Sequence, residues 1–272
     1  WRGRNSLSCQ AVRIAEMKKL NILIANDDGY FAPGIRALAV RLAKDHNVVV
    51  VAPKGERSGY AHMVNFFSGI TCEKIEMPDG IETYAVDGSP ADCVIFAVKH
   101  LYKERKFDVV LSGINSVLNI GSDVMYSGTF GAAQEGTFHR IPSIAISLRT
   151  RHSDEYGYSA EFIAKNLFEL IKYASEDITL NVNIPSPNKE NIKGIRVAPV
   201  TYRPYNEKYV VRTDENGNEV FFVDGKPDRS CIYDINGDCA LSDNGYITVT
   251  PIRMICNDAE VISAMQSAEF CL

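Results

Sequence analysis

The sequence predicts an α/β fold: a Rossmann-like, doubly wound and mostly parallel sheet, followed by a β-rich C-terminal extension. Short, continuous apolar runs alternate with segments that repeat apolar residues at helical spacing over the first 185 residues. Such runs are typical of strands buried on both faces of a parallel sheet. The chain has 272 residues, 46% of them hydrophobic, so a large core can form without disulfides or metals holding it together.

The first structural unit is a predicted β-α-β motif. An apolar strand is expected at Leu20–Ala25 and a second at Asn47–Ala52, and between them Ile35, Leu38 and Leu42 recur at helical spacing after Pro33. A strand, a helix and a strand in this order predict parallel pairing. The alternation continues with strands expected at 81–86, 108–111, 143–148 and 180–184, and helices at 91–102, 129–138 and 159–173.

The sequence changes character after Pro185. Two runs, Tyr209–Thr213 and Glu219–Val223, flank the turn-forming segment Asp214–Asn218, a pattern that indicates a β-hairpin. A further strand is expected at 246–249 and a terminal helix at 257–265. We therefore divide the chain into an upstream segment at 1–16, an α/β core at 17–185, and a C-terminal extension at 186–272.

Composition and charge exclude several classes of partner. The net charge is −5 and no basic patch occurs, which argues against binding of a nucleic-acid polymer. The seven cysteines are widely spaced and form no CxxC, so neither a zinc site nor a disulfide framework is indicated, and a cytoplasmic location is expected. No apolar run reaches transmembrane length. Residues 1–16 are polar and basic, and we expect Met17 to be the native start, with a targeting peptide as the alternative.

The candidate chemistry lies at the predicted carboxyl ends of the parallel strands, where open sheets of this kind bind ligands. Asp27 and Asp28 follow the first strand, Ser58 follows the second, and Asn115 follows the strand at 108–111. Two adjacent carboxylates are costly without a cation or donors nearby. Alone they fit a solvated Asp-Gly turn slightly better than a metal site, but a hydroxyl and an amide on the same rim favour a divalent-metal site with oxygen ligands.

A second group of residues points to an anion. Ser127, Gly128 and Thr129 precede a predicted helix, where backbone N–H groups and the helix dipole favour phosphate, although a simple Ser/Thr cap explains them equally well. Asn119 lies in the same rim segment. His62 is a candidate to protonate or polarise a substrate, or else an ordinary loop histidine. Neither a GxGxxG nor a GxxxxGK[ST] pattern follows the first strand, which argues against a dinucleotide site and a P-loop.

These segments resemble the SurE (survival-protein) family over almost the whole chain from Met17. The matching stretches are ILIANDDGYFAPGI, VVVVAPKGERSGYAH, VDGSPADCV, DVVLSGIN, NIGSDVMYSGTFGAAQEG and GYITVTPI. The resemblance implies a metal-dependent phosphatase that hydrolyses nucleoside 5′- and 3′-monophosphates, with some members acting on polyphosphate. It implies one divalent metal per subunit, such as Mg²⁺ or Mn²⁺, and a C-terminal extension that reaches a neighbouring subunit in a homodimer or homotetramer. The implied metal ligands are Asp27, Asp28, Ser58 and Asn115, and the implied phosphate contacts are Ser127, Gly128 and Thr129. Asn119 and His62 are added as candidate phosphate or substrate contacts from their places in the sequence.

The expected reaction depends on Asp27, Asp28 and Asn115, with Asp27 favoured as the group that orients or deprotonates water; a covalent aspartyl-phosphate route stays open. Two residues depart from the family pattern. Val117 stands where a glycine is usual, which would strain the loop if that position needs a positive φ, and Phe130 replaces a small aliphatic residue and could narrow or extend the pocket. The alternatives are an exopolyphosphatase, a broad phosphomonoesterase, or a non-catalytic nucleotide-binding protein.

Overall fold

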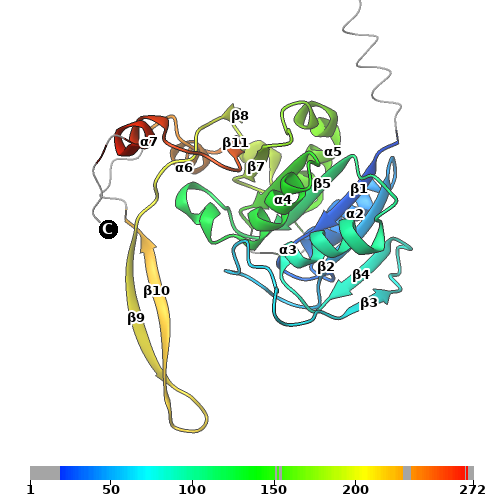
Figure 1. Cartoon of the computed structure of the whole chain (residues 1–272), viewed down its shortest axis with the longest axis horizontal. Helices are drawn as coiled ribbons and strands as arrows, with labels where there is room; N and C mark the ends of the chain where they lie inside the picture. Colours follow the sequence, from blue (N-terminus) through cyan, green and yellow to red (C-terminus); the bar gives the residue numbers. More distant parts are fainter. Residues whose placement is uncertain (1–18, 151, 153–154, 229–233, 267, 269–272) are drawn as a thin grey trace, which may run out of the picture.

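The main feature of the structure, a computed structural model, is one nine-stranded sheet in the order β3-β4-β2-β1-β5-β6-β7-β11-β8 (Figure 1). The structure describes residues 19–150, 152, 155–228, 234–266 and 268, so residues 1–16 and Met17 lie outside the described part. The strands of this sheet are β1 (Asn21–Ala25), β2 (Asn47–Pro53), β3 (Cys72–Ile75), β4 (Glu82–Val86), β5 (Val109–Asn115), β6 (Ser143–Leu148), β7 (Ile178–Ile184), β8 (Gly194–Val197) and β11 (Tyr246–Arg253). The helices are α2 (Pro33–Leu42), α3 (Pro90–Phe96), α4 (Gly128–Phe138), α5 (Gly157–Ile171), α6 (Asp238–Asp243) and α7 (Ala259–Gln266).

The six central strands pair in parallel, in the order β4-β2-β1-β5-β6-β7. Numbered along the chain, these strands have the spatial order 3-2-1-4-5-6, which is the Rossmann order. The predicted fold class is therefore confirmed. In this topology the chain direction across the sheet reverses between β1 and β5, and ligands bind outside the carboxyl ends of the strands at that point.

Helices cover both faces of the sheet because the central strands are apolar on both sides. In β1, Ile22 and Ile24 belong to one core cluster, whereas Leu23 and Ala25 belong to another. The first cluster packs beneath α2 and α5, and the second packs beneath α3 and α4. This two-sided burial explains why the strands appear in the sequence as continuous apolar runs.

The differences from the predicted elements lie at the sheet edges and in the last third. Strands β3 and β8 and helix α6 were not predicted, because all three are short and the two strands are mostly exposed, so they carry little apolar signal. The strand β5 continues to Asn115, four residues past its predicted end. Helix α3 ends at Phe96 and continues as a π-helical turn over Ala97–Leu101, within the predicted helical range.

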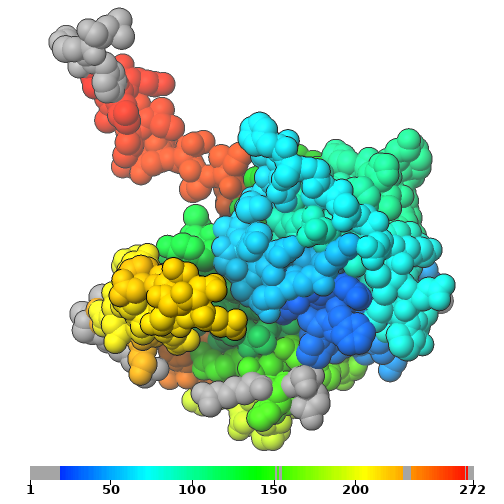
Figure 2. Space-filling model, turned by 90° about the horizontal axis from the view of Figure 1, so that it is seen from below, coloured from blue at the N-terminus to red at the C-terminus, as the bar shows by residue number. Residues whose placement is uncertain are grey.

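The predicted hairpin is present and longer than expected. Its strands β9 (Tyr205–Thr213) and β10 (Glu219–Pro227) pair only with each other, and they project from the body of the molecule (Figure 1). The C-terminal segment with α7 also extends away from the body, in another direction (Figure 2). Strand β8, which precedes the hairpin, and strand β11, which follows it, extend the main sheet beyond β7. The division of the chain at residue 185 remains a proposal.

No helix of the described residues is both long enough and apolar enough to cross a membrane.

Candidate active site

The predicted site residues meet at the point where the strand order reverses. Asp27 and Asp28 follow β1, and Asn115 is the last residue of the neighbouring strand β5. Asn26 shapes the turn that carries the two aspartates. Its side chain accepts a hydrogen bond from Gly29 N–H at 3.2 Å and donates one to Gly29 C=O at 2.9 Å. Asn26 is 1% exposed, so these bonds form in a buried position and fix the direction of both carboxylates.

The two adjacent carboxylates are in an unfavourable electrostatic environment. Burial raises the pKa of Asp27, and a hydrogen bond from Thr129 only partly opposes this. Burial, followed by repulsion from Asp27 and Glu56, raises the pKa of Asp28 to about 7. Neither aspartate forms an ion pair with any described residue. Such an uncompensated acidic pair is expected where a cation binds.

The loop after β2, residues 56–63, brings Ser58 to the same place. Its backbone is tied to β1, because Arg57 N–H donates to Asp27 C=O at 2.7 Å. Ser58 donates its hydroxyl hydrogen to the carboxylate of Glu56. Together with Asp28, both side chains line a cavity at this edge of the sheet.

Helix α4 points its N-terminus at the same acids. Ser127 caps the helix: its hydroxyl oxygen accepts a hydrogen bond from Phe130 N–H at 3.0 Å. Thr129 donates its hydroxyl hydrogen to Asp27 Oδ1 at 2.5 Å. A Cβ added at Gly128 would lie 2.8 Å from Asp27 Cβ and 3.1 Å from Pro90 Cγ. Only glycine therefore lets the helix start approach the carboxylate this closely. The arrangement brings N–H groups that have no partner within the helix next to the acidic pair, and the backbone N–H of Thr129 reaches the Asp27 carboxylate.

The segment after β5 forms another wall. Asn115 donates its amide hydrogen to Val117 C=O at 2.7 Å, and its amide oxygen accepts no hydrogen bond from the described residues. Val117 is not among the described residues with a positive φ, so the strain considered for this position is absent. Its side chain is 66% exposed.

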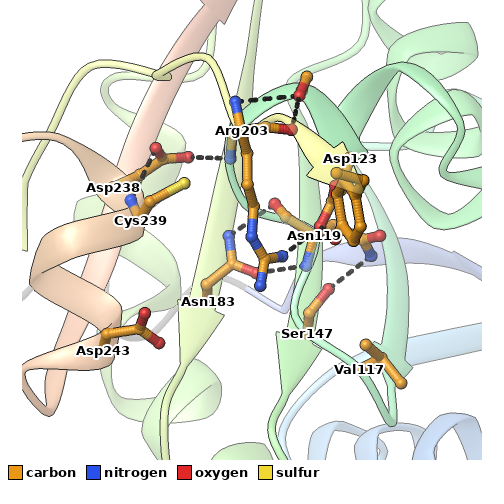
Figure 3. A network of polar contacts seen from close by, with 12 residues as sticks. Val117, Asn119, Asp123, Ser147, Asn183, Arg203, Asp238, Cys239 and Asp243 are labelled. Atoms are coloured by element: carbon orange, nitrogen blue, oxygen red, sulfur yellow. Dashed lines mark hydrogen bonds and ion pairs between the residues drawn. The ribbon is translucent and has the colours of Figure 1, made fainter. Parts of the chain in front are cut away.

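Asn119 is held rigidly by a network of side chains from β6 and β7 (Figure 3). Its N–H donates to Asn183 Oδ1 at 2.8 Å, its C=O accepts from Asn181 Nδ2 at 2.8 Å, and its own Nδ2 donates to Ser147 Oγ at 2.9 Å. Figure 3 shows Asn183 and Ser147 reaching Asn119 from adjacent strands. These buried bonds fix the wall of the cavity.

The surrounding groups enclose a cavity of about 420 Å³. Among the described residues, the charged part of its lining consists of carboxylates: Asp27, Asp28, Glu56, Asp123 and Glu207. Asp123 forms an ion pair with Arg203, which lies outside the described lining, and accepts a hydrogen bond from Tyr205 at 2.8 Å. The volume lies within the range of small-molecule sites, about 300–1,000 Å³.

The sequence missed several residues that line this cavity. Glu56 is an ordinary loop acid in the sequence, and Asp123 lies in a motif to which no role was assigned. Tyr205 and Glu207 come from the base of the hairpin, and no local signal identifies them because only the tertiary fold brings residues about 180 positions after β1 to this rim.

Two expected residues lie elsewhere. His62 does not line the cavity; its ring nitrogens lie 3.0 Å from Gln134 Oε1 and 2.6 Å from Glu135 Oε2. Phe130 is 5% exposed and packs with Val124 and Ala133, so it does not change the width of the cavity.

The donor set fits a hard divalent cation. Among the described residues no group of three or more His, Cys, Asp or Glu side chains is arranged to hold a metal. A cation here would therefore combine the two aspartates with neutral oxygens, and Ser58 and Asn115 offer a hydroxyl and an unpaired amide oxygen on the same rim. All-oxygen shells of this kind are typical of Mg²⁺ and Mn²⁺ sites.

The fold and the cavity together define a doubly wound α/β protein with an acidic cavity of small-molecule size at its switch point. The model of the family described as Survival protein SurE matches residues 22–207. The chain belongs to this SurE family.

Relatives and a solved structure agree with this membership. A 5′-nucleotidase SurE of Clostridium botulinum (strain ATCC 19397 / Type A) is 39% identical over 237 residues, covering 86% of this chain and 93% of the relative. A 5′-nucleotidase SurE of Clostridium beijerinckii (strain ATCC 51743 / NCIMB 8052) is 36% identical over 254 residues, covering 90% and 97%. The crystal structure of the Sure protein from Aquifex aeolicus superposes with a TM-score of 0.76 at 36% identity, covering 90% of this chain and 98% of that one.

Proposed function

We propose that this protein is a metal-dependent phosphomonoesterase that hydrolyses nucleoside 5′-monophosphates, and also 3′-monophosphates, to nucleoside and phosphate. One observation carries the proposal: a cavity whose charged lining, among the described residues, is entirely carboxylate lies against the N-terminus of α4. A phosphate monoester is repelled by such a lining unless a cation stands between them. The names of the relatives, which describe them as 5′-nucleotidases, agree with this proposal.

We infer that Asp27, Asp28, Ser58 and Asn115 hold one divalent cation per subunit. When bound, it supplies positive charge to the phosphoryl group and acidifies water. The hydrogen bond from Thr129 keeps Asp27 Oδ1 in a fixed direction, which suits a carboxylate that orients or deprotonates the attacking water. The acidic pair, together with Asn115, is therefore the catalytic group in this proposal.

The N-terminal turn of α4 is the proposed phosphate cradle. Ser127 lines the cavity, and Gly128 and Thr129 follow it in the first turn. Their backbone N–H groups have no partner within the helix and stabilise charge on the phosphoryl oxygens as it develops. Asn119 is the proposed contact on the opposite wall, and its rigid network suits this role.

The rest of the cavity suits a nucleoside. Tyr126, Tyr205 and Glu207 also line it, and they offer aromatic faces and a carboxylate that accepts hydrogen bonds from ribose hydroxyl or base amino groups. Glu207 repels phosphate, so the cavity wall around it favours the uncharged part of the substrate.

We also propose that the protein forms a homodimer or homotetramer through the hairpin. Its large apolar side chains are exposed, with Tyr209 at 70%, Val223 at 65% and Phe221 at 58%. A second chain that covers both faces of this isolated ribbon would bury them. The cytoplasmic location expected from the cysteine pattern stays a prediction.

The test is phosphate release from nucleoside monophosphates, p-nitrophenyl phosphate and polyphosphate, with Mn²⁺, Mg²⁺ or chelator. We expect metal-dependent release that favours nucleotides. Asp27→Asn should abolish turnover and leave the fold intact, because an asparagine still accepts from Thr129 but carries no charge, whereas Asp45→Asn on the surface should be fully active. Preference for polyphosphate would identify an exopolyphosphatase, and metal binding without any hydrolysis would identify a binding protein.

A further inference from the structure

One buried carboxylate on α4 has no part in the proposed reaction. Glu135 is 6% exposed and does not line the cavity. It lies between two histidines: His62 Nε2 is 2.6 Å from Glu135 Oε2, and His139 Nε2 is 3.1 Å from Glu135 Oε1. His139 is the C-cap of the same helix, whereas His62 comes from the 56–63 loop that carries Ser58.

Both ring nitrogens of His62 are used in holding the loop on α4. Its Nδ1 lies 3.0 Å from Gln134 Oε1, its Nε2 faces Glu135, and its ring stacks on Phe138 with centroids 5.0 Å apart. No nitrogen is left to face a substrate. Through these contacts the His62 side chain holds the 56–63 loop against α4.

The loop backbone lies directly on the helix at the same place. A Cβ added at Gly131 would lie 2.3 Å from Ala61 C=O, so only glycine allows this approach. Ala61 N–H donates to Tyr126 C=O at 3.1 Å, just before α4 begins. Ala61 has φ +51°, a conformation that residues other than glycine rarely adopt, so outside contacts must hold it.

We propose that Glu135 is a positioning residue: through His62 it clamps the 56–63 loop to α4 and thereby sets Ser58 against the Ser127–Thr129 turn. This inference rests on the proposed function, because it concerns how Ser58, a proposed metal ligand, is held in position relative to the proposed phosphate cradle. A buried carboxylate gives a strong, directional bond to an imidazole, whereas the exposed loop has few apolar contacts of its own. It also assigns His62 a positioning role in place of the substrate contact expected from the sequence.

The two histidines provide a matched experiment on the full-length protein. His62→Gln and His139→Gln each remove one imidazole from Glu135, but only the first releases the loop. Three quantities are measured: Mn²⁺ affinity by calorimetry, the rate of trypsin cleavage after Arg57 in the loop, and the melting temperature. Glu135→Gln is the third variant, because it keeps the side-chain shape and removes the charge.

We expect His62→Gln and Glu135→Gln to bind Mn²⁺ about tenfold more weakly, the lower end of what residues behind metal ligands cost. Both should be cleaved faster after Arg57, while His139→Gln keeps wild-type affinity and cleavage even if its melting temperature falls. A merely structural role would move all three variants together. Equal effects in His62→Gln and His139→Gln, or no effect in either, would overturn the clamp.

The outcomes separate this inference from the proposed function. Wild-type protein that binds Mn²⁺ but hydrolyses nothing defeats the proposed function, and the three variants still decide the clamp by affinity and cleavage. Wild-type protein that binds no Mn²⁺ also defeats the proposed function, and the cleavage rates alone then decide the clamp.

Discussion

Replacing Gly128 by alanine tests the closest contact in the site. The new Cβ would lie 2.8 Å from Asp27 Cβ and 3.0 Å from Asp27 Oδ2, whereas carbon atoms normally pack at about 3.5–4.0 Å. The atoms in the way belong to the stem of Asp27 and to the Pro90 ring, neither of which can swing aside freely. Either the N-terminus of α4 or the turn that carries Asp27 must therefore shift.

The magnitude follows from overpacking and from the precision that catalysis needs. Forcing a methyl group into a packed site costs about 1–3 kcal/mol, and restricting the unfolded chain returns about 0.4–1 kcal/mol of that. Mid-range values leave a net cost of about 1.3 kcal/mol, so we expect the melting temperature to fall by about 3–5 °C, at about 2–4 °C per kcal/mol for a domain of this size. A displacement of the order of 1 Å at a catalytic group costs about a hundredfold in rate, so a smaller shift of Asp27 should lower kcat at least about tenfold.

Gly157 is the matched control, because it is also the first residue of a helix, α5, and an added Cβ there meets nothing within 4 Å. Gly157→Ala should be as active as wild type and equally or slightly more stable. The assays are calorimetric melting and steady-state phosphate release from a nucleoside monophosphate with Mn²⁺. If Gly128→Ala matches Gly157→Ala in both, then α4 does not pack on Asp27 as described, and the cradle is misplaced.

Three further predictions concern charge and assembly. Asp28→Asn should raise the melting temperature in chelator, by the equivalent of about 1–2 kcal/mol, because it removes repulsion within a buried acidic pair; an unchanged or lower value would mean that Asp27 and Asp28 are well solvated. Burial raises the pKa of Glu135, but hydrogen bonds from His139 and His62 outweigh it and lower the pKa to about 2, from an ordinary 4.5. A carboxylate whose pKa is lowered in the folded state stabilises the fold above pH 4.5, and this stabilisation is lost as the pH falls toward 2. The free energy of unfolding in urea should therefore be about 1–3 kcal/mol higher for wild type than for Glu135→Gln above pH 4.5, and this difference should shrink as the pH falls. A difference that does not change with pH would contradict the lowered pKa of Glu135. Replacing the hairpin residues 206–226 by a short glycine-serine turn should reduce the mass measured by light scattering to that of a monomer, and an unchanged mass would show that the subunits meet elsewhere.

The core of the fold was predictable because it depends on local patterns. The continuous apolar run at β1 and the helical spacing of Ile35, Leu38 and Leu42 each follow from burial of one element, and together they require parallel strands. The exposed edge strands β3 and β8 lack such a pattern, because their side chains contribute little to the core.

The candidate site was predictable only in part, for a related reason. Asp27, Asp28 and Asn115 lie at or just after strand ends, and Ser58 lies in the loop after β2, so the rule for carboxyl ends of parallel strands is enough to place them on one rim. The same rule cannot show that Thr129 bonds to Asp27, or that the cavity has no cationic residue among its described lining. Those features depend on the directions in which side chains point.

The sequence by itself determined the α/β class, and it predicted a metal-type donor set and a phosphate-type helix start, since each depends on residues at or near the ends of individual strands and helices. The tertiary structure decided that Tyr205 and Glu207 from the distant hairpin complete the cavity, and that His62 faces Glu135 and not a substrate. Contacts between residues far apart in the chain depend on how helices and strands pack, and no local pattern specifies that packing. The loop histidine illustrates this limit, because its sequence position beside Ser58 suggested a substrate contact whereas packing on α4 directs both ring nitrogens into the protein.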